Sequence, residues 1–160
     1  MFSAPAFSLD FSVEFGGGVS FWENVNSMDL ALIAKPRISE EFWAQGSAEL
    51  SYLVEGKSGG DVTGASVNLY TVGGSYVIPF HSAFFRLGAL MGLAHSNFSL
   101  DGAKVNYNEF VVGPLVGLDI DLAAHWTFGV ELSYLSSLSF LSADDRVYRT
   151  RFGLSTGYLF

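Results

Sequence analysis

The last ten residues of the sequence, 151-RFGLSTGYLF-160, decide the fold. Every second side chain in this stretch is large or apolar, at Phe152, Leu154, Thr156, Tyr158 and Phe160. A period of two predicts a β-strand with one apolar face. Chain ends of soluble domains are normally poorly ordered. An apolar series that includes the final residue therefore raises the question of what this face contacts.

The same alternation fills the rest of the chain. The stretches 7-FSLDFSVEF-15 and 126-WTFGVELSYL-135 both place apolar residues on one face and small or charged residues on the other. This pattern predicts strands rather than amphipathic helices. Eight strands are predicted, at 6–17, 28–37, 42–55, 64–79, 84–97, 105–122, 126–139 and 148–160.

The predicted connections alternate between two kinds. Short turns are expected near 38–41, 80–83 and 123–125. Longer polar loops are expected near 18–27, 56–63, 98–104 and 140–147. In an up-and-down meander, alternate connections lie at opposite ends, so the short turns share one end and the loops the other.

Composition narrows the class of protein. Hydrophobic residues make up 49% of the chain and charged residues 15%, against a usual charged share of about 25%. No apolar run approaches the roughly 20 residues of a transmembrane helix. The net charge of −8, without a basic cluster, argues against a nucleic-acid partner. The absence of cysteine excludes disulfide and thiolate-metal sites.

An even number of strands, short turns at one end and longer loops at the other are typical of bacterial outer-membrane barrels. The predicted fold class is therefore all-β, an eight-stranded antiparallel up-and-down transmembrane β-barrel with short periplasmic turns and longer extracellular loops. Lipid offers no hydrogen-bond partners, so a spanning sheet must close on itself with its apolar face outward. The alternative is a soluble sandwich whose polar face meets water.

In a barrel the polar series faces inward. Arg86, Arg151 and Lys35 are expected to pair with interior carboxylates, and the surplus acids must contact water or stay protonated. The predicted interior polar network comprises Asp10, Glu14, Lys35, Glu49, Arg86, Glu109, Asp119, Asp121, Glu131 and Arg151.

Aromatic residues gather at the predicted strand ends, as the two interfaces of a membrane require. The predicted membrane-interface aromatics are Trp43, Phe80, Phe84 and Trp126 on the turn side and Tyr52, Tyr70 and Tyr134 on the loop side. Pro114 falls within a predicted central strand, where a missing N–H donor is unusual.

Over nearly its whole length the pattern resembles the OmpX/OmpA-type family of eight-stranded outer-membrane barrels. The most specific element is the ending, FGLSTGYLF. The resemblance implies that Tyr158 and Phe160 are an assembly signal read by the barrel-assembly machinery. It also implies location in the outer membrane of a diderm bacterium. Ala4-Pro5-Ala6 has the small-x-small pattern of a cleavage site, so residues 1–6 are expected to be a signal remnant and 7–160 one barrel domain.

Three classes of function stay open. The first is a structural or surface-interaction protein that contacts the lipid bilayer and carries a protein or glycan ligand at its loops. The second is a narrow pore or an OmpW-like conduit for small hydrophobic molecules. A charge bridge such as Arg86 to Glu131 would block permeation, and eight strands leave an interior just wide enough for side chains.

The third class is a lipid-modifying enzyme at the outer leaflet, centred on His95 in 94-AHSNFSLDG-102. A His/Ser pair with Asp101 could deacylate a lipid. His95 and Ser96 point to opposite faces of the predicted strand, which separates the pair, so no enzyme is expected. The loop carboxylates Asp61, Asp101, Asp144 and Asp145 lack the spacing of a calcium loop, so no metal or cofactor is expected.

Overall fold

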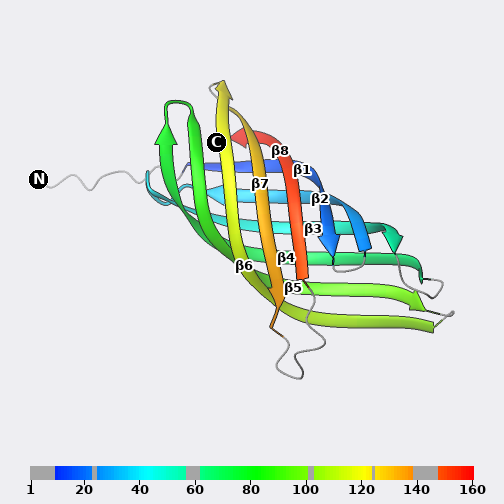
Figure 1. Cartoon of the computed structure of the whole chain (residues 1–160). Helices are drawn as coiled ribbons and strands as arrows, with labels where there is room; N and C mark the ends of the chain where they lie inside the picture. Colours follow the sequence, from blue (N-terminus) through cyan, green and yellow to red (C-terminus); the bar gives the residue numbers. More distant parts are fainter. Residues whose placement is uncertain (1–9, 23–24, 57–61, 101–102, 124, 139–147) are drawn as a thin grey trace, which may run out of the picture.

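A computed structural model describes residues 10–22, 25–56, 62–100, 103–123, 125–138 and 148–160. These residues form eight strands that close into a barrel in sequence order, and every neighbouring pair is antiparallel (Figure 1). The strands are β1 (Phe11–Trp22), β2 (Val25–Pro36), β3 (Phe42–Gly56), β4 (Val62–Phe80), β5 (Ala83–Leu100), β6 (Ala103–Ala123), β7 (Trp126–Ser137) and β8 (Tyr148–Leu159). The predicted fold class is confirmed.

Closure comes from the two end strands. β1 pairs with β8 from Ser12 opposite Leu159 to Trp22 opposite Arg149, so the sheet has no free edge. Along both strands exposed and buried residues alternate, because side chains of a strand point to opposite faces. The apolar series that runs to Phe160 is the outer face of the wall.

The first strand lies further along the chain than predicted. It spans Phe11–Trp22 instead of 6–17 and runs through Gly16-Gly17-Gly18. A side chain at Gly18 would meet the backbone carbonyl of Phe152 on β8. Glycine therefore allows a close approach of two strands here, and the predicted end of the strand at residue 17 was wrong.

Two predicted loops are also shorter than expected. β1 ends at Trp22 and β2 begins at Val25, while β5 ends at Leu100 and β6 begins at Ala103. The predicted loops 18–27 and 98–104 are mostly strand. Residues 1–6, the predicted signal remnant, lie outside the described residues.

The turn end carries one strained residue. Among the described residues other than glycine, only His81 has a positive φ, 61°. It follows β4 directly, where Phe80 pairs with Ala83 across a two-residue hairpin. Such tight hairpins need left-handed backbone.

Pro114 leaves a local interruption in the wall. β6 pairs with β7 at Val112–Ser136 and again at Leu115–Ser133, without pairs at Gly113 and Pro114 between them. The register is the same on both sides. A strand that lacks one N–H donor loses a rung there but keeps its alignment.

The barrel interior holds an apolar cluster as well as polar side chains. Val67 and Leu69 of β4, Leu90 of β5 and Leu115 of β6 are all at most 4% exposed and pack together. The half-buried Trp22 of β1 packs against them from across the lumen. The sequence analysis predicted a polar inward face and did not predict this apolar cluster.

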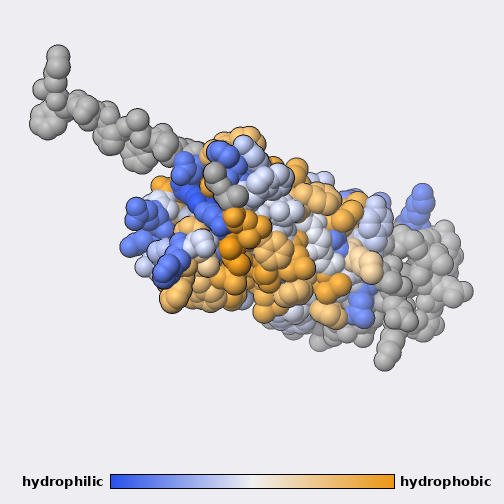
Figure 2. All heavy atoms as spheres, turned by 90° about the horizontal axis from the view of Figure 1, so that it is seen from above, coloured by the Kyte–Doolittle hydropathy of each residue, from blue (hydrophilic) through white to orange (hydrophobic). Residues whose placement is uncertain are grey.

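The outer surface is an apolar belt with polar groups beyond it (Figure 2). Along β5 the outward residues from Phe85 to Leu93 are all apolar, a span of nine residues. At ~3.3 Å per residue and a tilt of ~40°, this belt is ~23 Å tall, close to the ~25 Å apolar band of outer-membrane barrels. Within the described ranges no helix is long and apolar enough to cross a membrane.

Candidate functional site in the charge-filled lumen

The turn-side half of the lumen is organised around Lys35 of β2. Its Nζ lies 2.7 Å from Glu14 Oε2 and also donates to Asp119. All three side chains are at most 2% exposed. The Ser155 hydroxyl donates a further hydrogen bond of 2.6 Å to Glu14. Lys35 thus joins β1, β2 and β6 across the barrel.

Arg86 of β5 occupies the middle of the lumen. Its Nε donates to Asp119, its Nη1 lies 2.8 Å from Gln45 Oε1, and its Nη2 lies 3.4 Å from Glu131 Oε2. Opposite the guanidinium is Gly117, where a Cβ would come within 2.7 Å of Arg86 Nη2. The glycine provides the space that the guanidinium fills.

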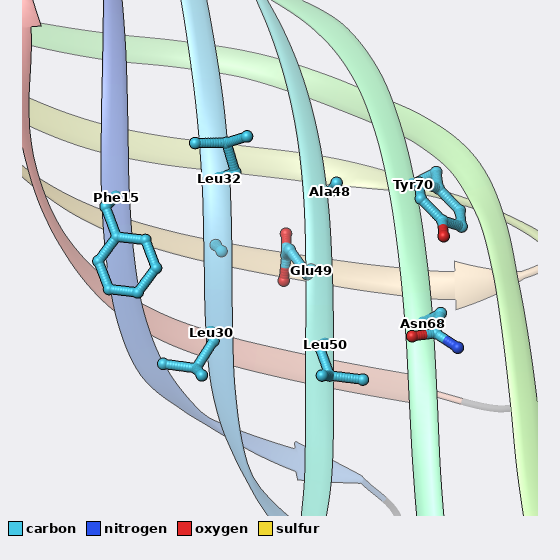
Figure 3. Close-up of a pocket in the computed structure, with 9 residues that line it drawn as sticks. Phe15, Leu30, Leu32, Ala48, Glu49, Leu50, Asn68 and Tyr70 are labelled. Atoms are coloured by element: carbon cyan, nitrogen blue, oxygen red, sulfur yellow. The ribbon is translucent and has the colours of Figure 1, made fainter.

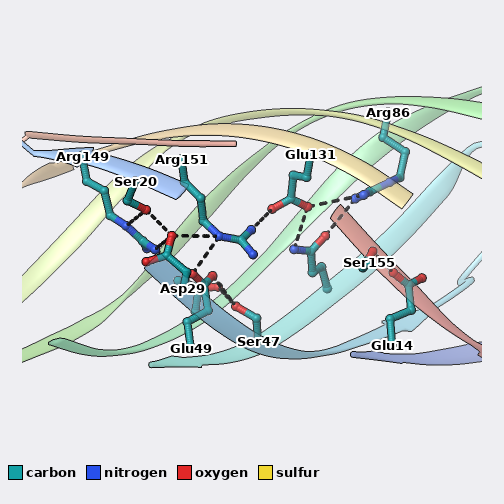
Figure 4. A network of polar contacts seen from close by, with 12 residues as sticks. Glu14, Ser20, Asp29, Ser47, Glu49, Arg86, Glu131, Arg149, Arg151 and Ser155 are labelled. Carbon is teal, nitrogen blue, oxygen red and sulfur yellow. Dashed lines mark hydrogen bonds and ion pairs between the residues drawn. The ribbon is translucent and has the colours of Figure 1, made fainter. Parts of the chain in front are cut away.

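Two further arginines from β8 fill the loop-side half. Arg149 Nη2 lies 3.1 Å from Asp29 and 2.9 Å from Glu49, and Arg151 Nε lies 3.2 Å from Glu49. Ser20 donates a hydrogen bond to Asp29. Figure 4 shows these contacts as one chain of charges that continues from Arg149 towards Arg86. The link is Arg151 Nη1, which lies 3.5 Å from Glu131.

A fifth cation, Arg37, stands at the turn-side mouth. Arg37 Nη2 lies 2.9 Å from Asp121, and its guanidinium carbon lies 4.4 Å from the ring centre of Trp43 and 5.0 Å from that of Phe84. The arginine is therefore held by two aromatic faces and one carboxylate. Trp43 is only 3% exposed.

The prediction that Trp43 and Phe84 lie at the membrane interface was therefore wrong. Both side chains project from the inner face of the sheet, on the same face as Gln45 and Arg86. Their partner is a cation in the mouth, not lipid. The other predicted interface aromatics are exposed on the outer wall, namely Phe80, Trp126, Tyr52, Tyr70 and Tyr134.

The structure brings most of the predicted polar residues together. Buried in the lumen and in ion pairs are Glu14, Lys35, Glu49, Arg86, Asp119, Glu131 and Arg151. Asp121 stands at the mouth with Arg37. Asp10 is exposed and precedes β1, and Glu109 is half-buried beside Ala94, away from the charge chain.

Four members of the site were missed. Asp29 and Arg149 stand on the same faces as Lys35 and Arg151, so strict alternation along 29–35 and 149–151 would have found them. Gln45 is two residues after Trp43 on the same strand, so alternation would have placed it inside if Trp43 had been placed inside. Arg37 lies beyond the end of β2, where alternation carries no information.

This arrangement favours a sealed interior. Five carboxylates and four cations are buried and each is in an ion pair. An eight-stranded barrel is just wide enough for side chains to fill, and the apolar cluster packs on the inner face of β4 to β7 beside the ion pairs. Buried ion pairs contribute little net stability, but removing one partner strands a charge.

The structure gives no support to catalysis at His95. Its Nδ1 lies 2.6 Å from Asn108 Oδ1 on the outer wall, while Ser96 lies on the opposite face. Asp101 and the loop acids Asp61, Asp144 and Asp145 lie outside the described residues. Within the described part of the chain no three His, Cys, Asp or Glu side chains are placed to hold a metal ion.

The C-terminal aromatics form a cluster on the outer wall at the turn end. Phe160 stacks on Phe11 of β1 at 4.9 Å between ring centres, and Tyr158 stacks on His125 at 5.2 Å. Trp126 contacts the edge of Tyr158. The last two aromatics therefore join β8 to both of its neighbours.

Solved structures with the same fold are outer-membrane barrels. The attachment invasion locus protein Ail of Yersinia pestis matches with a TM-score of 0.65 at 15% identity, over 95% of this chain and 99% of Ail. A second Ail structure, in complex with the heparin analogue sucrose octasulfate, has a TM-score of 0.66 at 16% identity and the same coverage. Neisserial surface protein A has a TM-score of 0.71 at 11% identity, over 92% of this chain and 96% of that one.

Sequence comparison adds nothing to this, because no family model and no curated protein matches the chain. The fold is nevertheless clear. It is that of the eight-stranded outer-membrane β-barrels of the OmpX/OmpA type.

Proposed function

We propose that the chain is an integral protein of the outer membrane of a diderm bacterium, with a structural or surface-interaction role and no enzymatic activity. The observation that carries the proposal is the pairing of an apolar outer belt with a lumen closed by ion pairs. Such a molecule needs lipid around it and leaves no aqueous path through it. Its contacts with partners are then confined to the ends and the outer wall.

The charge distribution restricts the ligand class. Of sixteen acids and eight bases, the lumen and mouth contacts use six acids and five bases. Ten acids and three bases remain, a net charge of −7. Residues in and beside the loop-end connections contribute −3 of it, namely Glu23, Glu55, Asp61, Asp101, Asp144 and Asp145 against Lys57, Lys104 and Arg146. A surface of this sign repels polyanions. The ligand at the loops is therefore a neutral glycan or a protein with a basic face, in contrast to the sulfated sugar in the Ail complex.

The decisive experiment is gel mobility in mild detergent, heated against unheated, combined with circular dichroism. A folded barrel migrates differently from its heated form and is β-rich only in detergent or lipid. A protein that is folded and monomeric without detergent would overturn the membrane assignment. Heparin-agarose binding at low salt tests the ligand class, and retention of the folded protein would contradict it.

One observation favours a second function, a conduit for small hydrophobic molecules. The rung missing at Gly113 and Pro114 lies next to Leu115 and Leu135 of the interior apolar cluster. The wall is thus weakest where the lumen is apolar. Uptake of a hydrophobic dye into vesicles that contain the folded barrel, reduced by Pro114→Ala, would support this function over the first.

We also propose that Tyr158 and Phe160 act as the signal for the barrel-assembly machinery. The exposed ring of Phe160 at the end of β8 supports this role, since a recognition element must be accessible. Its stacking on Phe11 shows a second, structural use of the same ring.

A further inference from the structure

The outer wall of β4, β5 and β6 changes from apolar to polar within one row of the sheet. Tyr70, Leu93 and Phe110 stand side by side across the three strands. The next row towards the loop end is Asn68, His95 and Asn108, and the row after it is Ser66, Asn97 and Asn106. These six residues are named the polar wall.

The chemistry of the polar wall suits hydroxyl groups. Its four amides each offer a donor and an acceptor, and its members include no carboxylate, lysine or arginine. His95 is fixed by its hydrogen bond to Asn108. A phosphate group would be expected to meet a cation, as phosphate sites usually provide one; on this face the exposed Lys104 stands one outward position beyond Asn106, outside the six residues. Sugar hydroxyls need only the neutral donors and acceptors present here.

A shallow trough opens beside this wall, lower on the apolar belt. It has a volume of about 210 Å³ and lies over Ala48, the small residue between Leu32 and Tyr70 in one row of the sheet. Phe15 and Leu50 complete its apolar rim, and Asn68 lies at its loop-side edge (Figure 3). The trough is therefore continuous with the lipid-facing belt at its base and with the polar wall at its edge.

We propose that this part of the outer wall binds one lipid with a sugar headgroup. Its acyl chain lies in the trough over Ala48, and its sugar hydroxyls contact Asn68, His95 and the rest of the polar wall. The proposal rests on the membrane location proposed above. Asn68 belongs to both parts of the site, because it lines the edge of the trough and is a member of the polar wall.

The test is native mass spectrometry of the detergent-folded barrel with two probes of equal acyl chains. The probes are a diglucosyl-diacylglycerol and a phosphatidylcholine. The glycolipid is expected to occupy the protein at least about fivefold more, the equivalent of one net hydrogen bond. Asn68→Leu should remove most of that preference, and Ala48→Phe should reduce binding of both lipids by filling the trough.

Matched controls separate the site from general effects. Thr150→Leu removes a hydroxyl from the outer wall at the same end but on β8, and Ala89→Phe enlarges a belt residue on β5. Both should bind as the parent does. A heat-dependent gel shift establishes folding for each variant, so a barrel that fails to fold in detergent contradicts the proposed function instead.

Two results would overturn the inference while leaving the membrane barrel intact. One is equal occupancy by both lipids, unchanged by Asn68→Leu. The other is a species of twice the protein mass that Ala48→Phe abolishes, which would assign the trough to a second copy of the chain.

Discussion

At the scale of single residues, the lumen depends on charges that have no route to water. Arg86 contacts Asp119, Glu131 and Gln45 at once. Arg86→Met should destabilise the barrel by about 3 kcal/mol, because it leaves buried carboxylates short of a partner. Urea unfolding in lipid vesicles, followed by tryptophan fluorescence, measures this cost.

Two variants sharpen that measurement. Leu132→Met on the outer wall is a volume-conserving control and should cost less than about 1.5 kcal/mol. Arg86→Met combined with Asp119→Asn removes one charge of each sign and should recover part of the loss. A single variant as stable as the parent would show that the ion pairs are solvated.

His81 has a backbone conformation that is unfavourable for a residue with a side chain. At a φ of 61° a side chain costs roughly 1 kcal/mol that glycine does not. His81→Gly should therefore raise the free energy of unfolding by about that amount, measured by the same urea titration. His81→Ala should give no gain, and equal stability of the two variants would refute the explanation.

At the scale of whole strands, the alternation of apolar and polar residues predicted the number of strands and the face of most residues. It predicted the ends of the strands less well. Asp119 and Arg151 could be placed inside because the residues around each alternate with a strict period of two. β1 could not be bounded, because Gly16-Gly17-Gly18 reads as a turn and becomes strand only through its partners β2 and β8. Tertiary pairing overrides local propensity in sheets.

Trp43 shows a second limit of the sequence pattern. An aromatic residue at a strand end suits a membrane interface, and which face it occupies depends on strand register. Here Trp43 lies on the inner face, and its partner Arg37 stands in the connection before β3. The contact between Arg37 and Trp43 can be recognised only when the connection between β2 and β3 is placed in three dimensions.

The last strand allows the two proposed uses of its final residue to be separated. Phe160→Ala removes the ring stack with Phe11 and the edge contact with Tyr158 and should cost about 1–2 kcal/mol in vesicle refolding. In cells the same variant should lower the amount of folded barrel in the outer membrane much more than this loss predicts. Phe11→Ala removes the stack but keeps the Tyr158 contact and the proposed signal, so as a control it is compared through its own loss in vesicles.

Losses in cells that match each variant's own loss in vesicles would assign the terminal ring to stability alone. A loss for Phe160→Ala larger than its vesicle value predicts, without such an excess for Phe11→Ala, would support recognition during assembly. The refolding experiment in vesicles provides the common reference, because no assembly machinery is present there.

At the scale of the molecule, two kinds of interior share one lumen. At the loop end the ion pairs come from Asp29 of β2, Glu49 of β3 and Arg149 of β8, and the apolar cluster covers the inner face of β4 to β7. Nearer the turn end Arg86 of β5, Asp119 of β6 and Glu131 of β7 continue the ion pairs, so charges there come from both sides of the barrel. The sequence did not reveal the apolar half. Val67 and Leu69 alternate with the polar Asn68. The apolar residues of this stretch face inward, whereas over most of the barrel the polar residues face the lumen and the apolar residues face outward.

This division predicts the electrical behaviour of the barrel. The folded protein in planar bilayers should show no stepwise current at moderate voltage, because ions would have to cross both charge pairs and packed apolar side chains. Removing the central charges with Arg86→Ala and Glu131→Ala together opens space beside Gly117 but leaves the apolar cluster intact. That double variant should pass at most brief, small currents.

Adding Leu90→Ala to the double variant should make the currents longer-lived, since it removes a buried side chain from the other half of the lumen. Steady conductance by the unmodified barrel would contradict the sealed lumen and support the conduit. Silence of the triple variant would show that the remaining side chains, the arginines of β8, the cluster around Lys35 and the rest of the apolar cluster, still close the path. In each case the current shows which part of the interior blocks ions, because the substitutions act separately on the central charges and on the apolar cluster.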